Sequence, residues 1–315
     1  MQQRSHVSTS AHTLGVGVLT AVVLAALTAC GGDGGNTATA TVTSMTVSAT
    51  KYGTPALVTI NGTNLSNLNL QASGCKNVTR LTTAPTASTD TSAYFNCTPS
   101  GAYSSTIIAV SNGGTIAQQP LTVPPPVVTM TVNGAGVTGT IVFNLKGNVA
   151  PITVDNFLAY VNMSPSFYNG TIFHRVVDMT NTLNGPEYDV IQGGTYGATT
   201  SGTLPAAKAG TLSPIALETT GGTNIQWTAA MARTSDPNSA TSGFFFNVKN
   251  NTAAFDTSAG PGYAVFADVS GSTAILNQIA ALATQSGACT TLVGFTDGSC
   301  VPIPNVTVLT AVQTQ

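Results

Sequence analysis

Short alternating runs of apolar and polar residues, separated by Gly, Asn, Ser and Pro, fill most of this 315-residue chain. Runs such as "SMTVSA", "ALVTING" and "STIIAVSN" have the two-residue period of half-buried strands. Helical periodicity stands out at only two places, both in the second half of the chain. The pattern therefore predicts a mainly β fold, in which a many-stranded barrel could close with helices over its ends.

The first expected helix lies in "TVDNFLAYV", with Thr153 as its N-cap. Its apolar residues recur at the i, i+3, i+4, i+7 spacing of one helix face: Val154, Phe157, Leu158 and Val161. The second is expected from about Ala274 to Ala283, capped by Ser272 or Thr273. It would turn four residues inward: Ile275, Leu276, Ile279 and Ala280.

Changes in composition divide the chain into four parts. Residues 1–29 are expected to be an export signal and residues 30–40 a flexible Gly-rich tether. Residues 41–123 are expected to form a small β-sandwich, and "GTPALVTINGTNL" within it is similar to immunoglobulin-like repeats of bacterial surface proteins. The extended "VPPPVV" segment, with prolines at 124–126, marks the boundary to a second domain at 127–315.

The leader carries Arg4 and an apolar run from Leu14 to Ala29 that ends in "LTAC". This ending resembles the lipobox of bacterial lipoproteins. The resemblance implies that Cys30 carries a lipid, and that the protein is held at a membrane of the bacterial cell envelope, facing the periplasm or at the outer membrane. An ordinary cleaved signal or a short membrane helix is the alternative, although the run is shorter than the roughly 20 residues of a spanning helix.

Four cysteines remain when Cys30 is set aside, and an exported protein is expected to pair them in two disulfides. Three pairings are possible. We expect Cys75 with Cys97 and Cys289 with Cys300, because each pair falls within one segment of the chain. A zinc site is the alternative, but no close C-x-x-C pair is present. No metal and no cofactor are expected.

Charge is scarce: Asp, Glu, Lys and Arg make up 6% of the residues, and the net charge is −2. Without a basic cluster, nucleic acid is excluded as a partner. After the leader, His174 is the only histidine, so a catalytic triad or a multi-histidine metal site would have to use it or be absent. Strand alternation predicts that His174 faces one side and that Phe173 and Arg175 share the other.

Five motifs occur in a characteristic order: "TVDNFLAYVN", "FYNGTIFHRVV", "VIQGG", "AAMARTSDPNSATSGFFFNV" and "GYAVFADV". Their order and spacing resemble the cyclophilin family of peptidyl-prolyl isomerases over roughly Val128 to Ala283. The resemblance implies an eight-stranded antiparallel barrel capped by two helices, which would act on proline-containing polypeptides.

The resemblance also implies the roles of individual residues. Arg175 would be the catalytic donor, Gln192 would bind a substrate carbonyl, and Phe245 would form the floor of the proline pocket. Other residues are implied to contact the peptide: Phe173, Val190, Ala232, Arg233, Phe255 and Tyr263. Without the resemblance each has a structural alternative, such as a core phenylalanine or a solvated surface residue.

The chain departs from the family pattern around this site. The segment "DMTNTLNGPEYDVIQGG" replaces the usual "PGFMIQGG", so that Val190 stands in a pocket position and Tyr188 is the nearby aromatic residue. Gly243 stands where the family has a glutamine, and Tyr263 where many members have histidine. These changes put catalytic efficiency in doubt more than the fold.

Three functions are consistent with these patterns. The first is an active prolyl isomerase that assists the folding of exported polypeptides. The second is a catalytically weak cyclophilin-like module or chaperone that binds proline-containing segments. The third is a surface adhesion or spacer protein in which residues 40–123 carry the function.

Overall fold

The computed structural model describes residues 39–100, 104–178, 187–198, 205–256, 260–284, 289–290 and 299–315. The predicted leader and Cys30 lie outside these residues. Within the described ranges, no helix combines the length and the apolar character needed to cross a bilayer.

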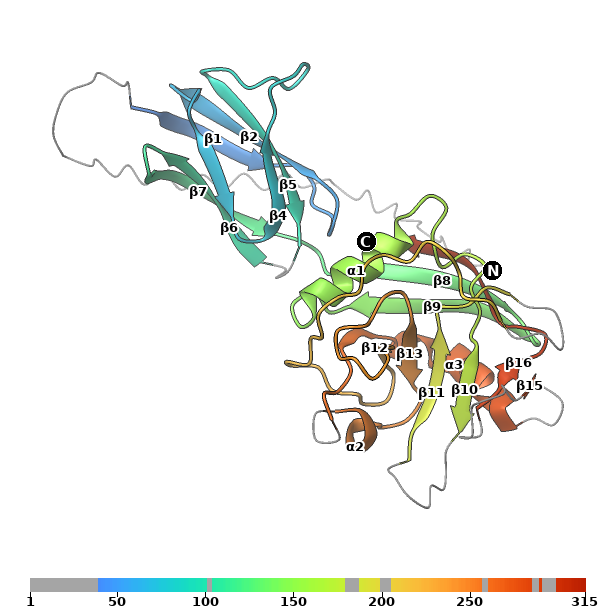
Figure 1. Cartoon of the computed structure of the whole chain (residues 1–315). Helices are drawn as coiled ribbons and strands as arrows, with labels where there is room; N and C mark the ends of the chain where they lie inside the picture. Colours follow the sequence, from blue (N-terminus) through green and yellow to red (C-terminus); the bar gives the residue numbers. More distant parts are fainter. Residues whose placement is uncertain are drawn as a thin grey trace, which may run out of the picture.

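The first part of the chain forms two antiparallel sheets that together make the predicted sandwich (Figure 1). The four-stranded sheet has the order β1-β2-β5-β4, with bounds Thr41–Val47, Ala56–Thr63, Ser92–Pro99 and Cys75–Arg80. The three-stranded sheet has the order β3-β6-β7, with bounds Asn69–Ala72, Ser104–Ser111 and Gly114–Thr122. The prolines at 124–126 lie between β7 and the first strand of the second part.

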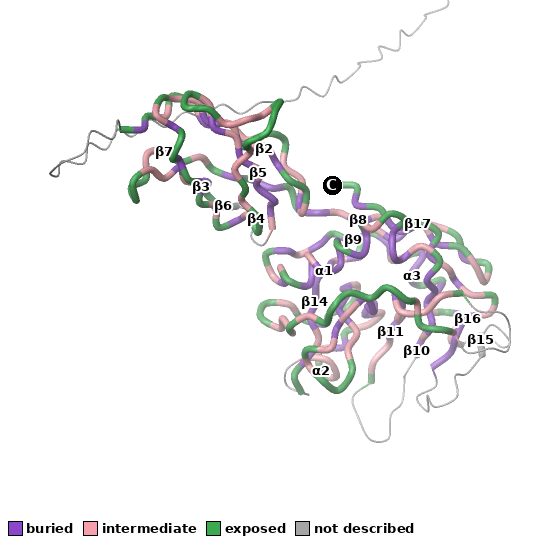
Figure 2. Tube along the Cα trace, turned by 45° about the horizontal axis from the view of Figure 1, so that its top comes forward, coloured by how far each residue is buried: buried purple, intermediate pink, exposed green. Residues whose placement is uncertain are grey.

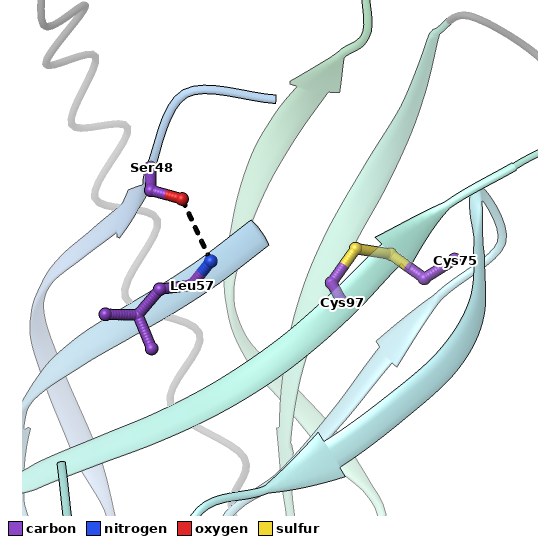
Figure 3. Close-up of a disulfide and its surroundings, with 4 residues drawn as sticks. All are labelled: Ser48, Leu57, Cys75 and Cys97. Atoms are coloured by element: carbon purple, nitrogen blue, oxygen red, sulfur yellow. Dashed lines mark hydrogen bonds between the residues drawn. A yellow bond between two sulfur atoms is a disulfide. The ribbon is translucent and has the colours of Figure 1, made fainter. Parts of the chain in front are cut away.

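A disulfide joins Cys75 and Cys97, as predicted, and connects the neighbouring strands β4 and β5 (Figure 3). The Cα atoms of the two cysteines are 5.4 Å apart, which is ordinary for a disulfide. In the same view, the Ser48 hydroxyl accepts a hydrogen bond of 2.9 Å from the amide of Leu57. Cys300 is also disulfide-bonded. The side chain of Cys289 is outside what the structure describes, so its pairing with Cys300 stays a prediction.

The second part is built on an eight-stranded antiparallel sheet with the order β10-β11-β13-β12-β14-β9-β8-β17. Its strands in chain order are β8 Val127–Gly134, β9 Val137–Leu145, β10 Arg175–Asp178, β11 Asp189–Gly193, β12 Thr228–Met231, β13 Phe244–Asn247, β14 Val265–Asp268 and β17 Thr307–Gln313. The sheet curls until the segment before β10 meets β17, where the amide of Val308 donates to the carbonyl of Thr171 over 2.8 Å. The predicted barrel is therefore confirmed. A short pair, β15 Cys289–Thr290 and β16 Val301–Pro302, lies beside it.

One face of the sheet closes on the main core, as the buried residues inside the barrel show (Figure 2). Val176, Ile191, Phe246 and Ala229 lie opposite one another on successive strands, and all are fully buried in this core. Because side chains alternate along a strand, their neighbours point to the outer face. The register therefore decides which residues are available to a ligand.

Helix α1 (Pro151–Val161) covers the side of the barrel that faces the sandwich (Figure 1). Its predicted apolar face is confirmed, because Val154, Phe157, Leu158 and Val161 are all buried. The predicted N-cap is wrong. The helix begins at Pro151 after Ala150, because proline has the backbone angle of a first helical residue.

Thr153 consequently lies inside the first turn of α1, where the carboxylate of Glu218 takes the capping role. The amide and the hydroxyl of Thr153 both donate to Glu218 Oε2 over 2.7 Å. The amide of Ile152 donates to Glu218 Oε1 over 3.1 Å. An acidic group at a helix N-terminus also interacts favourably with the helix dipole.

Helix α3 (Thr273–Ala280) follows the short turn η2 (Ser270–Ser272) and continues as η3 (Ala281–Thr284). Ser272 is the N-cap residue, as expected, but its hydroxyl accepts from the amide of Val142 instead of capping the helix. Ile275, Leu276 and Ile279 are buried as predicted, whereas Ala280 is only partly buried. A one-turn helix that the sequence did not predict, α2 (Thr252–Phe255), lies beside β13.

The turn after β1 contacts the second part of the chain through hydrogen bonds. Tyr52 in this turn is only 1% exposed. Its carbonyl accepts a hydrogen bond of 3.0 Å from the side chain of Gln313 in β17, and Lys51 Nζ donates over 3.0 Å to the carbonyl of Gln313. Lys76 in β4 lies 3.5 Å from the carboxylate of Asp155 in α1. The sandwich is thus attached to the barrel at both β17 and α1.

Candidate active site

Five residues form one row across five strands on the outer face of the sheet. Arg175 in β10 lies opposite Gln192 in β11, which lies opposite Phe245 in β13. Phe245 lies opposite Ala230 in β12, which lies opposite Val265 in β14. Directly paired residues of antiparallel strands place their side chains on the same face. The sheet therefore brings together Arg175, Gln192 and Phe245, the three predicted catalytic residues, although 70 positions separate the first from the last.

An apolar cluster occupies this outer face and is separate from the main core. Its buried members are Val177, Val190, Ala230, Phe245 and Val265, and four partly buried residues pack against them: Tyr188, Ala232, Phe255 and Tyr263. We call these nine residues the outer-face cluster. Apart from Phe173 and Arg233, every residue that the sequence predicted to contact the peptide belongs to it.

Aromatic rings give the outer-face cluster its shape. Phe245, Phe255 and Tyr263 lie edge to face with one another, with ring centroids 5.2 to 5.4 Å apart. Tyr188 extends the group, with its ring centroid 5.0 Å from that of Phe255. Phe245 is 5% exposed and lies at the base, while the other three rings are partly exposed around it. Such a surface can hold a small apolar ring.

The guanidinium of Arg175 is fixed by two hydroxyl groups. Its Nε donates to Ser299 Oγ over 3.0 Å, and one terminal nitrogen donates to the hydroxyl of Tyr188 over 3.0 Å. The guanidinium carbon also lies 5.7 Å from the centre of the Tyr188 ring. Since the same Tyr188 ring contacts Phe255, the cation lies at the border of the outer-face cluster.

Arg233 lies at the opposite border, over the ring of Tyr263 at 4.3 Å from its centre. Its Nε and one terminal nitrogen donate to the carbonyl of Gly262 over 3.0 and 2.8 Å. The other terminal nitrogen donates to the carbonyl of Thr234. Arg233 therefore holds the loop that carries Tyr263. The amide of Ala232 donates to the carbonyl of Gly243 over 2.9 Å, so this amide already has an acceptor within the protein.

His174 does not belong to this site. Its side chain is 3% exposed and its ring lies 4.5 Å from that of Tyr196, while its Nδ1 has no hydrogen-bond partner among the residues that the structure describes. Burial lowers the pKa of His174 to about 4, and the positive charge of Arg175 acts in the same direction. The imidazole is therefore neutral at pH 7 and is part of the packing.

The prediction that Phe173 shares a face with Arg175 is wrong. Strand β10 begins only at Arg175, so the alternation does not extend back to residue 173. Phe173 is fully buried in the main core, with its ring 5.9 Å from that of Phe246. It lies on the inner side of the sheet, where it cannot contact a peptide at the outer-face cluster.

Gly243 is enclosed by neighbouring side chains. A Cβ atom at this position would lie 2.7 Å from Thr195 Oγ1 and 3.4 Å from the Cβ of Ala232. The glutamine that the family resemblance leads one to expect has no room here unless Thr195 moves. Thr195 thus occupies the space that a larger residue at 243 would require.

Sequence reasoning missed Ser299, Ala230, Val177 and Val265. Ala230, Val177 and Val265 could have been found from strand alternation once the partner strands were known. Ser299 offered no such signal, because 124 positions separate it from Arg175. In the described part of the chain, no group of three or more His, Cys, Asp or Glu side chains is arranged to hold a metal ion.

An antiparallel barrel with a fixed guanidinium beside an aromatic cluster on its outer face is the arrangement expected of a cyclophilin. The family model for cyclophilin type peptidyl-prolyl cis-trans isomerase/CLD matches residues 127–310. The chain belongs to this family and is therefore a peptidyl-prolyl cis-trans isomerase.

Two bacterial relatives agree with this assignment. The peptidyl-prolyl cis-trans isomerase cyp18 of Streptomyces antibioticus is 41% identical over 152 residues, which are 47% of this chain and 81% of that protein. A peptidyl-prolyl cis-trans isomerase of Acinetobacter baylyi is 39% identical over 149 residues, 47% of this chain and 70% of the relative. A crystal structure of a Cryptosporidium parvum cyclophilin type isomerase, in the presence of the dipeptide Ala-Pro, aligns with a TM-score of 0.41 and 19% identity over 60% of this chain and 99% of that chain.

Proposed function

We propose that Arg175 accelerates isomerisation by stabilising the twisted prolyl amide, and that the substrates are exported polypeptides. Rotation about the X-Pro bond crosses a barrier of about 18 to 20 kcal/mol because amide resonance must be broken. In the twisted state the proline nitrogen regains a lone pair, which can accept a hydrogen bond from a guanidinium. The planar ground state offers no such acceptor, so the interaction favours the transition state selectively.

The observation that carries this proposal is the row of Arg175, Gln192 and Phe245 on adjacent strands. A proline ring packed on Phe245 would place its nitrogen toward Arg175, with the amide of Gln192 between them to bind a flanking carbonyl. Substrate binding and amide rotation need no titrating group in this arrangement. The neutral, buried His174 is consistent with such a mechanism.

The test is a protease-coupled isomerisation assay of the full chain on a proline-containing tetrapeptide, with Arg175→Ala compared to wild type. Removal of one preorganised donor to a transition state typically lowers kcat by about 100-fold or more, and we expect a loss of that order. Arg233→Ala is the matched control, because it removes an equal charge at the other border of the cluster. It should raise KM and change kcat little. Equal rates for wild type and Arg175→Ala would contradict the mechanism and favour a binding role.

The location in the cell envelope is a separate proposal, supported by the apolar leader and the "LTAC" sequence that ends at Cys30. Lipid attachment requires the Cys30 thiol, so Cys30→Ser should release the protein from the membrane fraction of the expressing bacterium. Wild type and variant should be compared by fractionation and by incorporation of labelled palmitate. Retention of the variant in the membrane fraction, or wild type without label, would refute lipid anchoring.

A further inference from the structure

The hydroxyl group of Ser299 is an unusual partner for the guanidinium of Arg175, because it comes from a segment at the far end of the chain. Ser299 is 1% exposed, and its Oγ accepts from Arg175 Nε over 3.0 Å. A hydrogen bond to Nε fixes the plane of the guanidinium more closely than a bond to a terminal nitrogen alone, because Nε is next to the last rotatable bond of the side chain. The hydrogen bond to Ser299 therefore helps to set the direction in which the terminal N–H groups of Arg175 point.

The backbone next to Ser299 is fixed to the strand that carries Arg175. The amide of Cys300 donates to the carbonyl of Val176 over 3.0 Å, and the amide of Val176 donates to the carbonyl of Cys300 over 2.9 Å. This antiparallel pair places Ser299 opposite Val177, a member of the outer-face cluster, and diagonal to Arg175. Cys300 is also disulfide-bonded, which adds a covalent constraint one residue from Ser299.

The second partner of the guanidinium, Tyr188, acts from the other side. Its hydroxyl accepts from a terminal nitrogen of Arg175 over 3.0 Å, while its ring packs on Phe255. A long arginine side chain loses rotamer entropy when it is immobilised. The hydrogen bonds to Ser299 and Tyr188 form before the substrate binds. The side chain of Arg175 is therefore already ordered, and this entropy loss does not add to the activation barrier.

We propose that Ser299 is a positioning residue of the isomerase, which together with Tyr188 holds the guanidinium of Arg175 in its catalytic orientation. This inference rests on the proposed role of Arg175 as the donor to the twisted amide. Ser299 itself is nearly inaccessible and acts through Arg175. Its loss should accordingly reduce the rate of turnover and leave the binding of the proline ring on Phe245 unchanged.

The first experiment measures kcat and KM for the full chain with Ser299→Ala, Arg175→Ala and the double variant. We expect Ser299→Ala to lower kcat about tenfold, the effect of losing one hydrogen bond to a charged group, with KM within twofold of wild type. In the Arg175→Ala background the same substitution should have no further effect. Tyr188→Phe, which keeps the ring and removes only the hydroxyl, should lower kcat in the same way.

The second experiment needs no variant at Ser299 and therefore does not depend on how well that variant folds. In nitrogen-15 NMR spectra of the wild-type full chain, the Nε–H signal of Arg175, assigned by its loss in Arg175→Lys, should exchange with water more slowly than those of exposed arginines.

The outcomes separate this inference from the proposed function. If Ser299→Ala keeps wild-type kcat, or lowers the rate equally with and without Arg175, Ser299 has no positioning role even though Arg175 remains catalytic. Fast exchange of the Arg175 Nε–H would overturn the inference in the same way. If Arg175→Ala itself is fully active, the catalytic role of Arg175 fails, and the positioning role of Ser299 fails with it.

Discussion

The burial of His174 makes the stability of this protein depend on pH in a predictable way. The folded state lowers the pKa of His174 from 6.5 to about 4, chiefly because its charged form is not hydrated in the interior. Between these two values the unfolded chain binds a proton that the folded chain does not bind. The free energy of unfolding must therefore fall as the pH is lowered through this range.

The magnitude follows from the two pKa values. A difference of one pKa unit corresponds to about 1.36 kcal/mol, so His174 accounts for a loss of about 2 kcal/mol between pH 8 and pH 5. The loss would reach about 3 kcal/mol at pH 4 and approach about 3.4 kcal/mol below it. Even the smaller figure is a considerable part of the stability of a typical domain.

The assay is urea unfolding, followed by circular dichroism at pH 8, 6.5 and 5, of the chain from residue 31 onward. This chain lacks His6 and His12, so His174 is its only histidine. The variant His174→Gln should show a nearly flat dependence over the same range, whatever its absolute stability. The imidazole C2 proton also allows the pKa of the folded state to be measured directly by NMR.

Two results would refute the reasoning. A measured pKa of 6 or above for folded His174 would show that the imidazole is hydrated in the native state. An equal loss of stability in wild type and in His174→Gln would show that other groups cause the pH dependence.

Three further predictions concern the contact between the domains, the base of the site and its border. Burial raises the pKa of Asp155 more than Lys76 lowers it, so the buried negative charge destabilises the folded state. Asp155→Asn removes this charge and should raise the urea midpoint at pH 7, whereas a lower midpoint would mean that the ion pair with Lys76 outweighs the cost of burial. Gly243→Ala should destabilise the fold by about 1 to 3 kcal/mol, because the new methyl group meets Thr195 Oγ1, and Thr195→Ala in the same chain should recover much of the loss in thermal unfolding. Phe245→Ala should destabilise the fold by about 3 kcal/mol and raise KM for proline peptides, whereas an unchanged KM would exclude Phe245 from the binding surface.

Local patterns predicted much of the fold correctly. The apolar face of α1 and the inward residues of α3 followed from periodicity, because burial of a helix face requires that spacing. The cap at Thr153 failed because sequence reasoning did not weigh Pro151, which begins the helix two residues earlier. Helix α2 has only four residues and is too short for a periodic signal.

The site depended on information that local patterns do not contain. Arg175, Gln192 and Phe245 were found through the family resemblance, and the strand register then explains why they lie together. Alternation placed Phe173 on the wrong face, because it was extended past the first residue of β10. Ser299 and Glu218 act across 124 and 65 positions of sequence, and only the folded chain brings such residues to their partners.

The contacts of Tyr52 and Lys51 with Gln313 bear on how the molecule moves as a whole. Together with Lys76 and Asp155, they give the sandwich two attachment points on the barrel besides the chain itself. The two domains therefore do not rotate relative to each other about the three consecutive prolines, and both should tumble with a single rotational correlation time. A polypeptide that reaches the outer-face cluster therefore meets the barrel and the sandwich as one body.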